Sequence, residues 1–197
     1  MSTSSARTKA TVVADFRRAQ ILDAARASFA HHGLRGTTMD DIARRARVAK
    51  GTIYLYYRSK EQILADALGD GIRALHAETV PPLAAPGPLD TKLRHFFTAT
   101  LTYFDRRRDF FYLCHSELDP QLREQAGTQL EAVYAAQRGA WASALRDADV
   151  ARPKAMAAMI VSLAFGLASQ RVRGWCQGPV ETDVAAATTL LSKGLAR

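Results

Sequence analysis

The chain has 197 residues and a mass of 21.6 kDa, the size of one or two compact domains. Hydrophobic residues make up 48% of it and charged residues 23%, a balance that excludes wholesale disorder. The net charge of +8 lies entirely in the first 60 residues, which carry 12 Lys/Arg against four Asp/Glu. A basic first third on a neutral remainder predicts that one part of the chain meets a polyanion. Nucleic acid is the better candidate, because no basic cluster flanks an apolar membrane anchor.

Several features argue against secretion or a membrane. Two cysteines do not make a disulfide framework. The longest uncharged apolar run, residues 155–170, has 16 residues, whereas a spanning helix needs about 20. The first residues are rich in Ser and Thr and have no apolar core of the signal-peptide kind. We therefore expect a soluble, cytoplasmic protein without a membrane partner.

Helical spacing of apolar residues recurs almost throughout, and strand signals are scarce. The pattern predicts an all-α fold of about nine helices. We expect them, in chain order, near residues 15–32, 38–46, 50–57, 60–79, 90–107, 110–118, 121–146, 153–175 and 182–195. Gly33 is placed to stop the first helix, and the proline-rich residues 81–88 follow the fourth. Thr38, with Asp41 three residues later, resembles a capping box at the start of the second.

The second and third helices are joined by only three or four residues, which predicts a helix-turn-helix. In such a unit the second helix enters the major groove of DNA while the first crosses the backbone. Ile53 and Tyr57, four residues apart, are expected to fill the small core of this unit. That arrangement leaves the exposed faces of the third helix to Lys50, Thr52, Tyr54 and Tyr56.

The stretch Gly36–Leu64, within a closer match from Ile21 to Leu64, resembles the N-terminal signature of the TetR family of one-component transcriptional repressors. The resemblance implies that the third helix is the recognition helix, with Lys50, Gly51 and Thr52 at its leading end. It also implies phosphate contacts by Thr38 and Lys60, and contacts to phosphate or base edges by Tyr54 and Tyr56.

Two positions depart from the family pattern. Arg47 stands where the family usually has glycine in the turn, and Ala49 where it often has serine as a helix cap. An arginine at positive φ costs about 1 kcal/mol, and the missing cap about 1 kcal/mol more. A phosphate contact by Arg47 would recover part of that cost.

The resemblance also implies a division into a disordered arm (1–14), a DNA-binding domain (15–60) and an effector-binding and dimerisation domain (61–197). Seven of the 16 aromatic residues fall between Phe96 and Tyr112, as core or as the lining of a ligand cavity. Family members bind small inducers in this region. The effector-binding candidates are Phe97, Thr100, Leu101, Tyr103, Phe104, Tyr112, His115, Glu117 and Gln137.

Residues 153–175 are apolar on nearly every face, so a helix formed by them must be buried on all sides. The cover is either a second copy of the chain or the rest of a monomeric bundle. A stripe on the last helix, formed by Val184, Ala187, Leu191 and Leu195, is a candidate partner surface. Together the two helices resemble the family's homodimer interface, a four-helix bundle.

These observations predict a repressor that binds a palindromic double-stranded DNA operator and is released by a small, largely apolar effector. The fourth helix is the expected transmitter, and Gly69 and Gly71 within it indicate either a flexible joint or loose packing. The histidines and cysteines offer no metal-ligand spacing, and no catalytic motif stands out, so we expect no metal, no cofactor and no enzyme. The alternative is an enzyme or carrier of apolar small molecules with an incidental basic N-terminal region.

Overall fold

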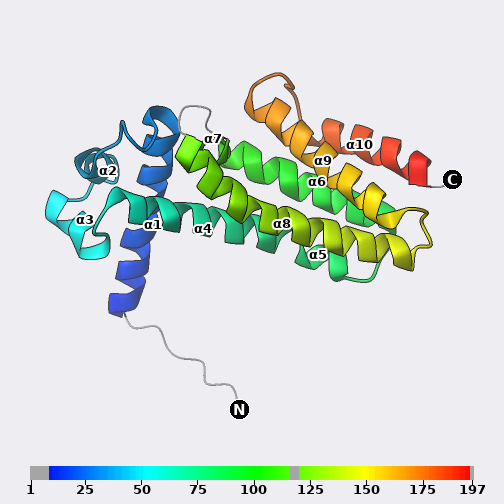
Figure 1. The fold of residues 1–197 in the computed structure, drawn as a ribbon, viewed down its shortest axis with the longest axis horizontal. Coiled ribbons are helices and arrows are strands. Elements are labelled where there is room, and N and C mark those ends of the chain that lie inside the picture. Colours follow the sequence, from blue (N-terminus) through cyan, green and yellow to red (C-terminus); the bar gives the residue numbers. More distant parts are fainter. Residues whose placement is uncertain (1–8, 116–119, 196–197) are drawn as a thin grey trace, which may run out of the picture.

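A computed structural model describes residues 9–115 and 120–195, which form helices and no strand (Figure 1). This confirms the predicted all-α fold. The helices are α1 (Lys9–His32), α2 (Met39–Arg45), α3 (Lys50–Tyr56), α4 (Lys60–Thr79), α5 (Pro81–Ala84), α6 (Leu89–Arg106), α7 (Arg108–Cys114), α8 (Pro120–Asp147), α9 (Pro153–Val172) and α10 (Val180–Leu195).

Two differences from the predicted elements have local causes. Helix α1 begins at Lys9, so residues 9–14, expected in a disordered arm, are helical. No glycine or proline interrupts that segment. The proline-rich segment after α4 contains the additional short helix α5, with proline in its first turn. Proline fits there because the first amide groups of a helix have no intrahelical acceptor to lose.

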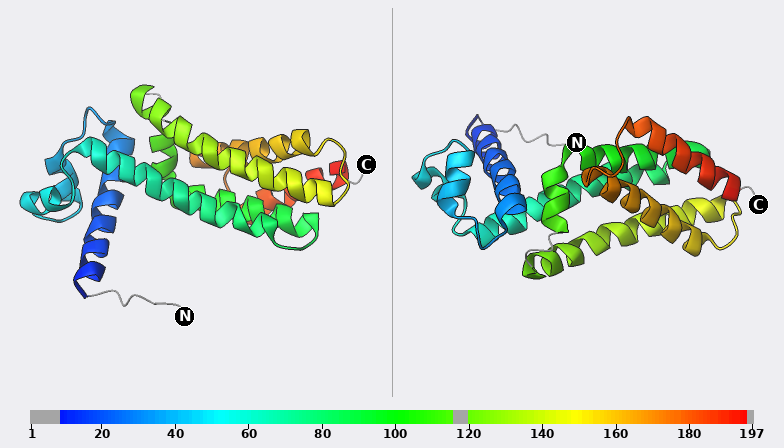
Figure 2. Two further views of the ribbon diagram at one scale, coloured as in Figure 1. Left: turned by 60° about the horizontal axis from the view of Figure 1, so that its bottom comes forward. Right: turned by 90° about the horizontal axis from the view of Figure 1, so that it is seen from above.

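Helix α1 and the short helices α2 and α3 lie together at one end of the molecule, and α4 leads from them into a bundle of the remaining helices (Figures 1 and 2). Gly33 ends α1 with a φ of 68° and donates its amide to the carbonyl of Phe29, as predicted. The bundle has an aromatic core, in which Trp141 on α8 packs edge-on against Phe96 on α6. The basic third of the sequence therefore forms one end of an elongated molecule.

Arg171 on α9 joins three helices at one side of the bundle. Its guanidinium donates to the carboxylate of Asp105 on α6 at 2.7 and 3.0 Å, and also to Asp183 on α10. The Arg171 side chain is only 8% exposed. A buried charge is tolerated when it is paired in this way, so Arg171 fixes α9 and α10 against α6.

Helix α9 is long and apolar enough to cross a membrane by length and composition, although 39% of its most apolar window is buried in the structure. The helix has 20 residues because it extends beyond the 16-residue uncharged run at both ends, where it includes Lys154 and Arg171. A bundle helix of a soluble protein passes the same test, and α9 packs along α8 and α6.

The prediction that an apolar stripe on α10 contacts a second copy of the chain is wrong for the three stripe residues whose side chains the structure describes. Val184, Ala187 and Leu191 are buried within the subunit, where α10 packs against α6. The side chain of Leu195 lies outside the described residues. An apolar stripe at helical spacing needs cover, and here the same chain supplies it. The face of α10 left open carries Leu190, which is 66% exposed.

Candidate functional site

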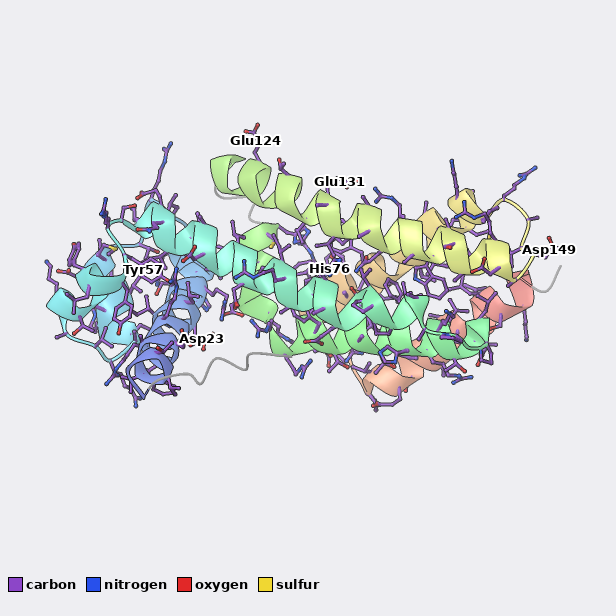
Figure 3. The ribbon with its side chains drawn as sticks, turned by 90° about the horizontal axis from the view of Figure 1, so that it is seen from below. Asp23, Tyr57, His76, Glu124, Glu131 and Asp149 are labelled. Atoms are coloured by element: carbon purple, nitrogen blue, oxygen red, sulfur yellow. The ribbon has the colours of Figure 1, made fainter. Side chains whose placement is uncertain are left out.

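The predicted core of the helix-turn-helix is confirmed. Ile42 on α2 and Ile53 on α3 are fully buried, and Tyr57, which follows α3, is 1% exposed. Figure 3 labels Tyr57 at the junction of α3 and α4. Its hydroxyl accepts a hydrogen bond at 3.1 Å from Arg18 on α1, which also pairs with Asp66 on α4. Burial raises the pKa of Tyr57, so the phenol stays neutral, and the contacts of Arg18 hold α1, α3 and α4 together.

Thr38 and Asp41 form the predicted capping box at the start of α2. The Thr38 hydroxyl accepts from the Asp41 amide at 3.2 Å, and the Asp41 carboxylate accepts from the Thr38 amide at 3.1 Å. The same carboxylate accepts the Thr38 hydroxyl proton at 2.6 Å, and these bonds hold the pKa of Asp41 below its usual value. A phosphate contact by the hydroxyl would therefore compete with Asp41 for this proton.

The turn between α2 and α3 keeps a left-handed conformation although arginine replaces the glycine usual in the family. Arg47 adopts a φ of 54°, in the left-handed region that favours glycine. Ala49, the residue before α3, makes no side-chain capping bond. The Arg47 side chain is exposed, so its guanidinium is free to extend from the turn toward a ligand.

The outer surface of α3 is formed by its first two residues and by a pair in its second turn. Lys50 and Gly51 are exposed, as are Tyr54 and Leu55, whereas Thr52 and Tyr56 are half-buried. The Lys50 ammonium pairs with Asp40 on α2 at 2.8 Å, which raises the pKa of Lys50.

Lys60 has a structural role that the sequence did not indicate. Its ammonium donates to the carbonyls of Leu34 at 2.7 Å and Thr37 at 3.0 Å, both in the connection between α1 and α2. These bonds fix the start of α4 against that connection and occupy two of the three hydrogens. One hydrogen remains for the phosphate contact that the family resemblance implies.

Among the effector-binding candidates, Phe97, Leu101 and Phe104 lie in the bundle core and are at most 1% exposed. Two polar candidates are engaged with α4. The Tyr103 hydroxyl donates to the carbonyl of Gly71 at 2.6 Å, and the Gln137 amide donates to the Thr79 hydroxyl at 2.8 Å. These side chains therefore connect α6 and α8 to the helix that leads to the DNA-binding end.

The remaining candidates are not all brought together. Tyr112 is 43% exposed, and its hydroxyl donates to the carbonyl of Val172 at the end of α9. His115 stacks on Phe111 with 4.5 Å between ring centroids and lies 4.9 Å from Phe165. Burial lowers the pKa of His115, which keeps the imidazole neutral at pH 7. Glu117 lies outside the described residues.

The structure adds interior residues that sequence reasoning missed. The Tyr134 hydroxyl and the Trp141 indole N–H on α8 are buried without a hydrogen-bond partner among the described residues. The same holds for the hydroxyl of Thr100 on α6, which was a predicted candidate. Buried polar atoms are usually hydrogen-bonded, so these three groups are open to a partner that the protein itself does not supply. The spacing of Tyr134, Gln137 and Trp141 at i, i+3 and i+7 places them on one helix face, which is the signal that could have found them.

Comparison with known proteins agrees with this geometry. Residues 21–67 match the family model for bacterial regulatory proteins of the tetR family. The transcriptional regulator BetI of Agrobacterium fabrum is 38% identical over 73 residues, which are 36% of this chain and 35% of BetI. The transcriptional repressor KstR2 of Mycolicibacterium smegmatis is 35% identical over 92 residues, 46% of this chain and 44% of KstR2. The chain thus spans less than half the length of either relative.

The likeness in fold covers nearly the whole chain. The crystal structure of the regulator FadR from Bacillus subtilis, in complex with stearoyl-CoA, superposes with a TM-score of 0.71. The superposition covers 88% of this chain and 96% of FadR at 18% identity, which shows a shared fold. By sequence, the helix-turn-helix end of the chain is thus similar to the tetR family of bacterial regulatory proteins, and the bundle at the other end shares the fold of FadR.

Proposed function

We propose that this protein is a transcriptional repressor that binds a palindromic DNA operator and leaves it when a small, largely apolar effector binds. The observation that carries the proposal is the outer face of α2 and α3. Its core residues are buried, so the exposed remainder of α3 is free to enter a groove. Exposed arginines surround it at positions 44, 45, 47 and 58, and they provide the positive charge that DNA phosphates require.

The proposed DNA contacts divide into two kinds. Lys50, Gly51 and Thr52 begin the recognition helix and lie against bases and the adjacent backbone. A Cβ on Gly51 would meet no atom within 4 Å, so this side of the helix is open to close approach. Phosphate contacts, which position the protein without reading sequence, are assigned to Thr38, Arg47 and Lys60. Tyr54 and Tyr56 contact phosphate or base edges.

A palindromic operator calls for two copies of the chain, and the last two helices support such a dimer. Met159 on α9 is 60% exposed and Leu190 on α10 is 66% exposed. Burying these side chains against a second copy would remove unfavourable apolar surface from water. We assign the dimer contact to this open face, in place of the α10 stripe that the subunit covers itself.

The effector site is proposed for the interior between α6, α8 and α9. The apolar surroundings suit an apolar molecule, and the unpaired polar atoms of Thr100, Tyr134 and Trp141 would orient a few polar groups on it. FadR, which has the same fold, is bound to stearoyl-CoA in its crystal structure. That the nine effector-binding candidates named from the sequence line one cavity stays a prediction.

Helix α4 connects the DNA-binding end to the proposed effector site. At Asp70 and Gly71 it is contacted by α1 on one side and by α6 and α7 on the other. Arg26 on α1, whose side chain is 6% exposed, donates to Asp70 at 3.1 Å. On the next residue, Gly71, the carbonyl accepts from Tyr103 and the Cα lies against the Phe110 ring. An effector that moves α6 or α7 would therefore move α4, and with it α1 and the helix-turn-helix.

The test is a fluorescence anisotropy titration with DNA that flanks the gene and a scrambled sequence of equal length. We expect a preference for the flanking DNA at moderate salt, and we expect a compound that raises the melting temperature of the protein to weaken operator binding. Absence of any sequence preference would overturn the proposal. If an apolar compound then bound without affecting DNA binding, the result would favour a carrier or enzyme of apolar molecules.

A further inference from the structure

The recognition helix carries a leucine that the proposed DNA contacts do not include. Leu55 is 83% exposed, more than any other large hydrophobic side chain in the described chain. Leu55 is not a core residue, because the buried hydrophobic side chain of this helix is Ile53. Single exposed apolar side chains are common on protein surfaces, and Leu55 differs from the others in lying on the helix that we propose reads DNA.

The position of Leu55 in the sequence indicates which face of α3 it occupies. In a helix, residues three and four apart share a face, so Leu55 lies on the side of Thr52 and Gly51. Successive residues turn by about 100°, which places Leu55 on the side of α3 opposite the buried Ile53. Gly51 has open space where a side chain would be, so Leu55 stands beside uncovered backbone. This is the face that would enter the major groove.

The surroundings of Leu55 favour DNA over an apolar protein surface. Arg47, Lys50 and Arg58 are exposed in the turn, at the start of α3 and just after its end. Such a basic rim suits a phosphate backbone. A leucine side chain has no hydrogen-bond donor or acceptor, so it cannot read guanine, adenine or cytosine by their polar edges. The apolar group that the major groove presents is the C5 methyl of thymine.

We propose that Leu55 determines part of the operator sequence by packing on the C5 methyl of one thymine in each half-site. The inference rests on the proposed function, because it requires that α3 read DNA. Leu55 adds an apolar contact to the hydrogen bonds and charge contacts of its neighbours. Replacing this leucine should change which base the protein prefers at one symmetric pair of positions and leave the rest of the operator unaffected.

The experiment uses the full chain and the duplex that it selects from a random palindromic library. Each thymine is replaced in turn by deoxyuridine, which differs only by the missing methyl, and the dissociation constant is measured at fixed salt. Burial of a methyl-sized group is worth about fourfold in affinity, hence about fifteenfold when both half-sites of a dimer lose it. We expect this loss at one pair of positions for the wild type, and Leu55→Ala should be insensitive to the replacement there. A 5-methylcytosine placed there should bind the wild type more tightly than cytosine.

Thr52→Ser is the matched control, since it removes the other methyl on this face and keeps the hydroxyl. If Leu55 is the reader, Thr52→Ser keeps the wild-type sensitivity to deoxyuridine at that pair. The slope of affinity against salt should be the same for wild type and Leu55→Ala, because no charge is removed. Leu55 is exposed, so its replacement should leave the melting temperature nearly unchanged.

Two results would overturn the inference and leave the proposed function standing. One is a selected operator in which no thymine responds to deoxyuridine, and the other is a Leu55→Ala variant with the full wild-type response. Failure of the wild type to select any sequence would overturn both. If a protein partner covers Leu55 instead of DNA, one of these two patterns should appear.

Discussion

Replacing Gly71 by alanine distinguishes a packed contact on α4 from the flexible joint that its glycines also suggest. A Cβ at Gly71 would lie 2.2 Å from Cε2 of Phe110, and 2.5 and 2.8 Å from two further ring carbons. A Cβ at Gly69, two residues earlier on the same helix, would meet only the guanidinium end of Arg73 at 3.1 Å. The two positions share a helix and a residue type, so they form a matched pair.

The expected free energies follow from these distances. Alanine in place of glycine inside a helix gains about 1 kcal/mol, which Gly69→Ala should show in full because the Arg73 side chain can move. Overpacking costs about 1–3 kcal/mol. The upper value applies at Gly71, because Phe110 is fully buried and packs edge-on against Tyr103 with 5.9 Å between centroids. Gly71→Ala should therefore lose about 2 kcal/mol net.

For a chain of this length, 1 kcal/mol corresponds to a change of about 2–4 °C in melting temperature. Thermal unfolding followed by circular dichroism should thus show Gly69→Ala above the wild type by about that amount, and Gly71→Ala below it by about 4–8 °C. Adding Phe110→Leu to Gly71→Ala should cost less than Phe110→Leu alone, since the smaller side chain leaves room for the methyl group. Equal stabilisation by both alanines would refute the packed contact and support a flexible joint.

Three further predictions concern other parts of the molecule. Lys60→Ala should lower the melting temperature, because two carbonyls lose their donor. In salt titrations it should weaken binding to all DNA and reduce the slope of log affinity against log salt concentration by about 1 per subunit. An unchanged slope would leave Lys60 with the structural role alone. Met159→Glu should convert the dimer into a monomer, as measured by light scattering, whereas Ala135→Glu, at an exposed position on α8, should leave the dimer intact. A wild type that is monomeric at micromolar concentration would contradict the proposed interface. Burial lowers the pKa of His115 in the folded chain. As the pH falls through about 6.5, His115 therefore becomes protonated in the unfolded chain before it does so in the folded chain. Denaturant titrations should therefore show stability lost from pH 7.5 to 5.5, and a smaller loss in His115→Phe; an equal loss in both would exclude His115 as its source.

The sequence by itself determined the features that depend on neighbours within about one helical turn. The stop at Gly33 and the capping box of Thr38 and Asp41 each follow from residue type and a spacing of a few positions. The helix-turn-helix follows as well, because two short amphipathic helices and a short connection leave few ways to bury Ile53 and Tyr57. Local geometry is encoded in local sequence, and these predictions were confirmed.

The tertiary structure decided which surface covers which. The spacing on α10 showed an apolar stripe, but only the fold showed that α6 of the same subunit buries it. Lysine is typical of protein surfaces, yet the two carbonyls that accept hydrogen bonds from Lys60 lie 23 and 26 residues away in the chain. The closeness of Gly71 to Phe110 likewise joins positions far apart in sequence. Periodicity shows that a face is apolar or that a charge needs a partner, and it does not identify the partner, because that depends on how distant segments pack together.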